Sequence, residues 1–364
     1  MLDQSFCYIT VKLLFMSSHR KKISLADIAR EAGLSRNAVS LALRNDRSIP
    51  VSTRERVKGI ARRLGYSRNP YVSEIMARHR SHGNAGHQGT FALFNGNFDP
   101  EAFIRHPTIP LYVAGAKRRA NEWGYRLDSF WLHDPTMRGE RLRNILDSRG
   151  ICGVLVVGLM NQNRLPEQFR PVLESFPCVV TGVRTRQPAL NFACVDHHIL
   201  ALRAVEKAIS LGYRRPGLVL DRQIEDLIEH RFSAGYRVGQ QNLPPDARLE
   251  PHLDSVEAET AFEAFRHWFQ RERPDVLLIL YNEVRDWLEK LKVRVPEDMG
   301  LIQLEWRATH PEIAGMNQHN DLTGEAAVEM LLALIHQNHS GIPAFPRATL
   351  IGPTWVNGPS VMNP

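Results

Sequence analysis

The sequence predicts an all-α domain of three short helices, followed by a larger α/β domain of two lobes that each contain a doubly wound parallel sheet. Two short apolar patterns with helical spacing meet at Gly33, and a third follows them. From residue 89 onward, continuous apolar runs alternate with helical stretches, which is typical of parallel strands covered on both faces. Positive charge is concentrated in the first part of the chain, which supports the division into two domains.

The charge distribution also suggests a polyanionic partner for the first domain. Residues 20–80 hold 15 Lys and Arg against 5 Asp and Glu, whereas the rest of the 364-residue chain holds 31 against 34. Such a basic segment is typical of nucleic-acid binding, although a solvated basic surface has the same composition. The four cysteines form no CxxC pair, which favours buried thiols over disulfides or a zinc site. No apolar run is long enough to cross a bilayer.

Residues 1–20 are expected to lie outside the folded domains. The run FCYITVKLLFM is short and apolar, and it lacks the basic leader and small-residue cleavage site of a signal peptide. Met16 stands just before the segment in which the regular pattern begins. Either Met16 is the natural start, or these residues form a disordered extension.

The first two predicted helices make a helix-turn-helix. Apolar residues with helical spacing follow the capping residue Ser24, and Gly33 supplies the turn after them. Ser35 is the natural N-cap of the second helix, and the small residues Ala38 and Ala42 allow this helix to pack closely on the first. A pair of this kind presents the N-terminal end of its second helix outward. Its outer face carries Arg36, Asn37, Ser40 and Leu41.

A third helix and a linker complete the basic segment. Ser52 and Glu55 have the spacing of a capping box, ahead of an apolar stripe that runs to Leu64. A short helix is expected after Asn69 and Pro70, and its apolar edge is too small for it to fold alone. The run SHGNAGHQG indicates a flexible joint. The expected boundaries are residues 21–66 for the three-helix domain and 67–88 for the hinge helix and linker.

The remaining residues, 89–364, alternate between strand-like and helical runs. Seven apolar runs predict strands: TFALFNG, ICGVLVVGL, CVVTGV, FACVD, PGLVLD, DVLLILYN and GLIQLEW. Helices are expected near residues 110–123, 165–175, 197–211, 225–241 and 283–291. These elements are too many for one small sheet, so we expect two lobes with a ligand crevice at the carboxyl ends of their strands. The expected lobes are residues 89–190 with 320–346, and 191–318 with 347–364.

The first domain resembles the DNA-binding headpiece of the lactose-repressor (LacI) family. The resemblance rests on ISLADIAREAGLSRNAVSLALRNDRSIPVSTRERVKGIARRLGYSRN, which follows the family pattern without a gap. It implies that Arg36 and Asn37 read base edges, and these side chains suit guanine and adenine respectively. A solvated charge is the alternative for Arg36. The DNA-contacting candidates are Ser24, Ser35, Arg36, Asn37, Ser40, Leu41, Arg44, Tyr66, Asn69 and Ile75.

Three positions depart from the family pattern. Leu41 stands where many members carry an arginine that reads a base, which implies a different operator sequence. Arg68 replaces the proline that usually precedes Asn69. Ile75 stands where the family commonly has a leucine that enters the minor groove and kinks the duplex. Packing between two hinge helices is the alternative role for Ile75.

The second domain resembles the effector-binding half of the same family, which is similar to periplasmic sugar-binding proteins. VDHHILALRAVEKAISLGYRRPGLV and VRVPEDMGLIQLEW carry the resemblance, together with HRFSAGYRVG, which is matched to the family's R-x-x-G-F/Y. It implies that Arg231 clamps the ligand and that Glu305 contacts it, while Trp306 is able to stack on a sugar ring. A strand-end residue satisfied by its neighbours is the alternative for each candidate. The effector-binding candidates are Phe98, Asp99, Asp196, Arg231, Asn282, Glu305 and Trp306.

The implied function is a cytoplasmic, nucleoid-associated transcription regulator with a helix-turn-helix headpiece and a periplasmic-binding-protein-like effector domain. It would bind a pseudo-palindromic double-stranded DNA operator as a homodimer, under allosteric control by a small ligand such as a sugar or sugar derivative. No enzymatic activity, cofactor, metal or membrane partner is expected. The alternative is an enzyme, because Asp196-His197-His198 resembles a metal-dependent phosphoesterase triplet, but no second carboxylate cluster accompanies it. A free solute-binding protein would not carry a headpiece. Whether the ligand releases or promotes DNA binding stays open.

Overall fold

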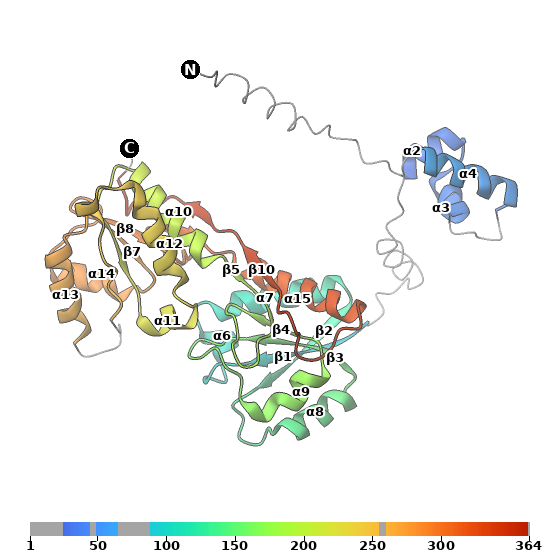
Figure 1. Cartoon of the computed structure of the whole chain (residues 1–364), viewed down its shortest axis with the longest axis horizontal. Helices are drawn as coiled ribbons and strands as arrows, with labels where there is room; N and C mark the ends of the chain where they lie inside the picture. Colours follow the sequence, from blue (N-terminus) through green and yellow to red (C-terminus); the bar gives the residue numbers. More distant parts are fainter. Residues whose placement is uncertain (1–24, 44–48, 65–87, 255–259, 363–364) are drawn as a thin grey trace, which may run out of the picture. The chain divides into compact units, whose positions relative to one another are not determined.

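The computed structural model describes residues 25–43, 49–64, 88–254 and 260–362, in two units that divide between residues 85 and 86 (Figure 1). The first unit contains three helices, α2 (Leu25–Ala32), α3 (Arg36–Leu43) and α4 (Val51–Arg63). Their inward residues form a small core: Ile28, Ala29, Ala32, Val39, Ala42, Val57, Ile60 and Ala61. The predicted three-helix packing is therefore confirmed for the described part of this unit.

The turn between α2 and α3 has the predicted chemistry. Gly33 has a φ of +62°, a left-handed conformation that glycine adopts without steric cost. The hydroxyl of Ser35 accepts a hydrogen bond from the amide of Ala38 at 3.2 Å, so Ser35 does cap α3. The predicted capping box of α4 is wrong, because the helix begins at Val51 after Pro50 and no side chain caps it. Ser52 thus lies inside the first turn.

The first lobe of the second unit is built on a six-stranded parallel sheet with the order β10-β5-β4-β3-β1-β2. Its strands are β1 (Gly89–Asn95), β2 (Tyr125–Trp131), β3 (Ile151–Val157), β4 (Cys178–Thr181), β5 (Asn191–Val195) and β10 (Ala348–Ile351). Two helices, α7 (Ile109–Glu122) and α15 (Asn320–His336), cover one face. The other face packs on α8 (Gly139–Ser148) and α9 (Arg170–Ser175), while the short α6 (Ala102–Arg105) precedes α7.

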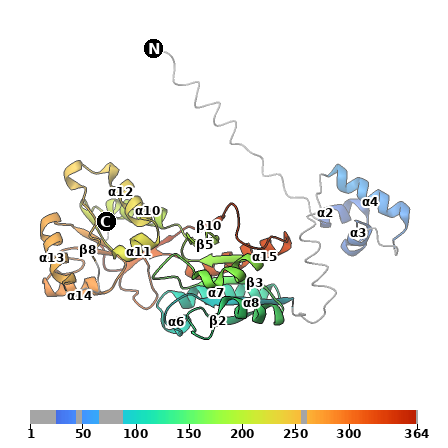
Figure 2. The ribbon, with the colours of Figure 1, turned by 60° about the horizontal axis from the view of Figure 1, so that its bottom comes forward.

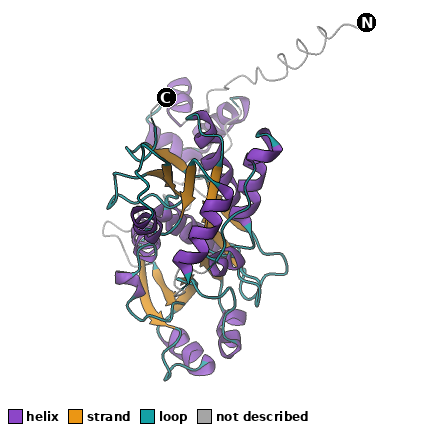
Figure 3. Ribbon diagram, turned by 90° about the vertical axis from the view of Figure 1, so that its left-hand side faces the viewer, coloured by secondary structure: helices purple, strands orange, loops and turns teal. Residues whose placement is uncertain are grey.

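The second lobe is built on a five-stranded sheet with the order β11-β9-β8-β7-β6. Its parallel strands are β6 (Pro216–Val219), β7 (Val276–Ile279), β8 (Gly300–Gln303) and β9 (Ala314–Asn317), and β11 (Thr354–Val356) pairs antiparallel to β9. Helices lie on both faces of the strands (Figure 3). They are α10 (His197–Ser210), α11 (Arg222–Leu227), α12 (Arg231–Gly239), α13 (Ala261–Glu272) and α14 (Glu283–Lys290).

All seven predicted strands are present, but the predicted division into lobes differs from the observed sheets. β5 and β10 were expected in the second lobe, yet they pair with each other and belong to the first sheet (Figure 2). The chain therefore crosses between the lobes after β5, before α15 and after β10. The helix expected at residues 225–241 is divided into α11 and α12, because Glu229 and His230 between them both have left-handed φ angles.

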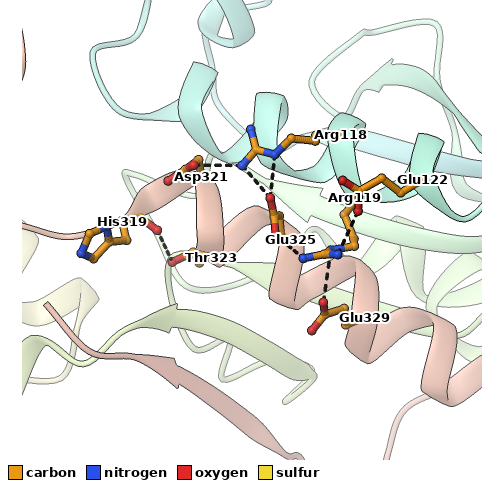
Figure 4. A network of polar contacts seen from close by, with 8 residues as sticks. All are labelled: Arg118, Arg119, Glu122, His319, Asp321, Thr323, Glu325 and Glu329. Atoms are coloured by element: carbon orange, nitrogen blue, oxygen red, sulfur yellow. Dashed lines mark hydrogen bonds and ion pairs between the residues drawn. The ribbon is translucent and has the colours of Figure 1, made fainter.

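The helices α7 and α15 pack closely against each other on one face of the first sheet. Gly115 and Gly324 face the partner helix so closely that an added Cβ would overlap the carbonyl oxygens of Asp321 and Tyr112 respectively. Two arginines of α7 then pair with acidic residues of α15 along the exposed edge of this contact (Figure 4). This network joins Arg118 and Arg119 to Asp321, Glu325 and Glu329.

Replacing Gly115 with alanine tests this close contact. The added methyl group forces α7 and α15 apart, so Gly115→Ala should lower the free energy of unfolding by about 1–3 kcal/mol. Urea titration of the full chain, followed by circular dichroism, measures the change. Gly352→Ala is the matched control, because a Cβ at Gly352 meets nothing within 4 Å. Equal stability of the two variants would contradict the proposed packing.

Candidate functional site

A cavity of about 320 Å³ lies between the two lobes of the second unit. The first lobe contributes the segment before α7, the start of α7 and the residues that follow β3 and β4. The second lobe contributes α10 to α12 and the residues that follow β7, β8 and β9. The cavity therefore lies at the carboxyl ends of parallel strands, where the sequence predicted a ligand crevice.

The carboxylate of Glu305 joins the two lobes across this cavity. Its residue is only 6% exposed and follows β8 in the second lobe. Oε2 accepts hydrogen bonds from Thr108 Oγ1 at 3.1 Å and from Arg307 Nη2 at 2.9 Å. Oε1 accepts a hydrogen bond from Asn320 Nδ2 at 2.8 Å. Since Thr108 precedes α7 and Asn320 begins α15, a buried charge of the second lobe is satisfied largely by donors of the first.

His106, which precedes α7 in the first lobe, holds the start of that helix through hydrogen bonds. Its Nδ1 accepts hydrogen bonds from the amides of Thr108 at 3.1 Å and Ile109 at 3.3 Å, which places the ring proton on Nε2. Burial lowers the pKa of His106, against the opposing attraction of Glu305. The imidazole is thus neutral, and its accepting nitrogen caps a helix whose own N-cap side chain makes no such bond.

His197 and Phe232 line the cavity on the side of the second lobe. The His197 ring packs edge-on against the Phe232 ring, with 5.0 Å between ring centroids. Burial, with a smaller repulsion from Arg231, lowers the pKa of His197 to about 3. The glycine at position 235 allows α12 to approach α10 at this point, because a Cβ there would overlap the carbonyl oxygen of His198.

Two of the predicted effector-binding residues line the cavity, Asn282 and Glu305. Asn282 Oδ1 accepts a hydrogen bond from Gln303 Nε2 at 3.1 Å. Asp196 does not line the cavity and instead caps α10, accepting from the amide of Ile199 at 3.2 Å. It therefore has the strand-end role that was its alternative.

Arg231 is not part of the cavity wall, which corrects the sequence alignment. Its guanidinium lies 3.8 Å from a carboxylate oxygen of Glu229 and 5.9 Å from the centre of the Phe192 ring. The expected pattern is R-x-x-G, but Arg231 stands four residues before Gly235. Phe232 stands three residues before it and does line the cavity. A shift of one residue turns a helical side chain by about 100°.

Three other candidates also lie outside the cavity wall. Phe98 is 55% exposed and packs on the ring of His133, with centroids 4.5 Å apart. Asp99 Oδ1 accepts from the amide of Glu101 within its own turn. Trp306 is the neighbour of two cavity residues, Glu305 and Arg307, but is itself absent from the wall. Sequence reasoning missed Arg307, which stands two residues after Glu305 and also lines the cavity.

In the first unit, the structure describes the predicted recognition helix, α3, but few of the side chains predicted to contact DNA. α3 begins at Arg36, directly after its cap Ser35, and Leu41 is half-buried. The side chains of Arg36, Asn37 and Ser40 are outside the description, and their roles stay predictions. The remaining candidates lie outside the described residues: Ser24, Arg44, Tyr66, Asn69 and Ile75. The predicted extension over residues 1–20 and the hinge helix lie there too.

The triplet Asp196-His197-His198 was the feature that suggested a metal-dependent enzyme. Within the described ranges, no three His, Cys, Asp or Glu side chains are grouped to hold a metal ion. The triplet Asp196-His197-His198 is divided between a helix cap and a buried ring. Among the helices that the structure describes, none has the length and apolar composition needed to span a bilayer.

Comparison with known proteins identifies both units. Residues 24–69 match the family described as bacterial regulatory proteins, lacI family, and residues 205–361 match the periplasmic binding protein-like domain. The HTH-type transcriptional regulator CelR of Thermobifida fusca is 23% identical over 327 residues, which cover 86% of this chain and 92% of that protein. A second curated relative, the HTH-type transcriptional regulator MalR of Streptomyces coelicolor, is 25% identical over 60% of each chain.

Solved structures share the fold. A CelR–cellobiose complex has a TM-score of 0.57 at 20% identity, over 93% of this chain and 99% of that chain. The lac repressor dimer bound to operator and the anti-inducer ONPF has a TM-score of 0.53 at 16% identity, over the same shares of both chains.

These observations define the class of DNA-binding transcriptional regulators with a periplasmic-binding-protein-like effector domain, rather than a class of enzymes. The helix-turn-helix precedes the two-lobed domain, and the two family matches occur in the same order along the chain. The chain therefore carries a LacI-family DNA-binding domain followed by a periplasmic-binding-protein-like domain.

The buried His197 should make the stability of this domain depend on pH. Its pKa is about 3 in the folded chain and near 6.5 when unfolded, so between these values only the unfolded chain takes up the proton. Stability from this residue is complete above pH 6.5 and declines as the pH falls. Between pH 7.5 and pH 5 the loss should be about 2 kcal/mol of unfolding free energy.

Urea unfolding at the two pH values measures this loss. In His197→Gln the pH-dependent difference should shrink by that amount, and the remainder should reflect His106 and His252, whose pKa values burial also lowers. His267→Gln, at an exposed position of α13, is the control and should keep the full difference. An unchanged pH dependence in His197→Gln would show that this ring is not kept neutral by the fold.

Proposed function

We propose that this regulator binds a pseudo-palindromic operator as a homodimer, and that a small ligand in the cavity between the lobes changes its operator affinity. The observation that carries the proposal is the buried Glu305 carboxylate. It lines the cavity and also accepts hydrogen bonds from Thr108 and Asn320 of the other lobe. Dimerisation follows from the size of the headpiece, since one recognition helix of eight residues contacts few bases and two-fold pairing doubles them. An operator-binding regulator would work in the cytoplasm, at the nucleoid.

Ligand control would act through the position of the lobes. A ligand that contacts both lobes binds most tightly to the arrangement in which both lobes reach it. Binding therefore raises the population of that arrangement. The first lobe carries β1, which continues the chain from the headpiece, so its movement reaches the hinge segment and alters DNA affinity. Family resemblance gives sugars as the first ligand class to consider, and the polar groups of Asn282 and Arg307 are suitable hydrogen-bonding partners for hydroxyls.

Selection of DNA from a random duplex pool by the full chain tests this function. We expect an enriched sequence with inverted-repeat symmetry, bound by two chains, and retention that falls steeply as salt rises. Light scattering of the complex gives the number of chains. Recovery of no common sequence, or one chain per site, would contradict the proposal.

The role proposed for Arg36 can then be measured on the selected operator. A bidentate contact with a base edge accounts for about 1–3 kcal/mol of discrimination, so Arg36→Ala should weaken specific binding by that amount and affect random DNA much less. Fluorescence anisotropy with labelled duplexes gives both affinities.

Arg62→Ala is the matched control for Arg36→Ala. It removes the same charge from an exposed position in the last turn of α4. It should weaken the selected operator and random DNA to the same small extent. If the two variants behave alike, Arg36 acts through its charge and belongs outside the set of base-reading residues. Leu41 is then the next position to examine, because an apolar side chain there suits contact with a thymine methyl group.

A further inference from the structure

Three segments of the chain cross between the lobes, and hydrogen bonds connect them to one another. One crossing lies between β9 and α15, and a second lies between β10 and β11. His319 of the first crossing and Thr354 at the end of the second share a hydrogen bond of 2.8 Å between Nε2 and Oγ1. In the third crossing, after β5, the amide of Asp196 donates to the carbonyl of Ile351 at 2.9 Å. Any relative movement of the lobes must therefore change torsion angles within this connected group of segments.

His319 is the residue at which the first crossing passes from one lobe to the other. Gln318 before it is held in the second lobe, where its Nε2 donates to the carbonyl of Leu304 at 3.0 Å. Asn320 after it begins α15, which covers the first sheet, and its Nδ2 donates to Glu305 Oε1 at 2.8 Å. The φ and ψ angles of His319 therefore set the direction in which Asn320 leaves the second lobe.

The backbone of His319 has a conformation that is unfavourable for a residue with a side chain. Its φ is +52° and its ψ is +51°, in the left-handed region, and such angles persist only where surrounding contacts determine them. Its amide donates to Asn317 Oδ1 at 2.9 Å, and its carbonyl accepts from the hydroxyl of Thr323 at 3.4 Å (Figure 4). The imidazole supplies the third contact, and this contact reaches a different crossing of the chain.

We propose that His319 is a positioning residue for the Glu305 contact, and that its hydrogen bond with Thr354, here called the hinge bond, fixes the angle between the lobes. His319 is absent from the cavity wall, so it acts through Asn320 rather than on a ligand. Without the hinge bond the crossing is free to adopt other torsion angles, and Glu305 loses the fixed position of one of its donors. The inference rests on the proposed function only where it connects the arrangement of the lobes with operator affinity.

Three substitutions separate the hinge bond from the backbone conformation. Thr354→Val replaces the hydroxyl with a methyl group of similar size. His319→Asn keeps a residue that tolerates the left-handed region, but its polar atoms lie closer to the backbone than Nε2 of histidine. His319→Gly adopts the same backbone angles without steric cost and lacks the ring. If the hinge bond matters, all three variants behave alike, whereas a role for the backbone angles alone leaves His319→Gly and Thr354→Val unchanged.

Hydrogen–deuterium exchange of the full chain, measured by mass spectrometry, reports local opening at the joint. In all three variants the amides of residues 104–112 and 318–324, around the Glu305 contact, should exchange about threefold to tenfold faster, the range that one neutral hydrogen bond supplies. The amides of α13, in the second lobe, should not change. Equal acceleration in every segment, which indicates general destabilisation, would overturn the proposal. Unaltered exchange in His319→Gly or Thr354→Val would overturn it too.

Thr349→Val and His339→Asn are the matched controls. Thr349 is a half-buried residue of β10, and His339 is exposed beyond the end of α15, so both lie outside the crossings. Both controls should exchange like the unmodified chain. The double variant His319→Asn, Thr354→Val should equal either single variant, because the two changes remove the same bond. Additive effects of the two changes would contradict a shared bond.

Operator affinity separates this inference from the proposed function. If the arrangement of the lobes controls DNA binding, the three hinge variants should change affinity for the selected operator by about threefold to tenfold. Faster local exchange with unchanged operator affinity would uphold the hinge bond and count against the proposed function. Changed operator affinity with unaltered exchange at residues 104–112 and 318–324 would sink the hinge bond and leave the proposed function standing.

Discussion

The buried carboxylate of Glu305 is the interaction on which the arrangement of the effector domain depends. A carboxylate that is 6% exposed has lost most of its water, and the fold replaces that water with three donors. Two of these, Thr108 and Asn320, come from the first lobe, while Arg307 comes from the same segment as Glu305. The lobes therefore cannot separate at this point without leaving a charge that water or a ligand must solvate.

The position of those donors is set by the contact between α7 and α15. Thr108 and Asn320 lie at the N-terminal ends of the two helices, so both are fixed when the helices pack together. Gly115 and Gly324 permit the close approach, and the ion pairs between Arg118, Arg119 and the acidic residues of α15 add contacts along the exposed edge (Figure 4). The contact at Gly115 and Gly324 lies away from the cavity, but it sets the cavity's geometry because both helices begin at the cavity.

Much of the fold could be predicted because buried parallel strands form continuous apolar runs. β2 escaped prediction because it lies at the edge of its sheet and carries exposed polar residues, and the four residues of β9 are too few to form a pattern. Glu305 and Asn282, named from the resemblance, line the cavity, whereas Arg231 does not, and Phe232 instead stands three residues before Gly235. Thr108, Asn320 and Phe232 come together only through tertiary packing, which spacing along the chain does not encode.

Exposed ion pairs join the two lobes at Glu229, and they differ in strength from the Glu305 contact. Arg184 and Arg186 of the first lobe pair with Glu229 of the second at 3.4 and 3.1 Å, but these arginines are about half exposed, so the pairs are weak and screened by salt. The Glu305 contact is buried and loses little to screening. Any relative movement of the lobes is therefore easier at the rim of Glu229 than at that of Glu305. A ligand between them shifts the equilibrium only through contacts that differ in the two arrangements.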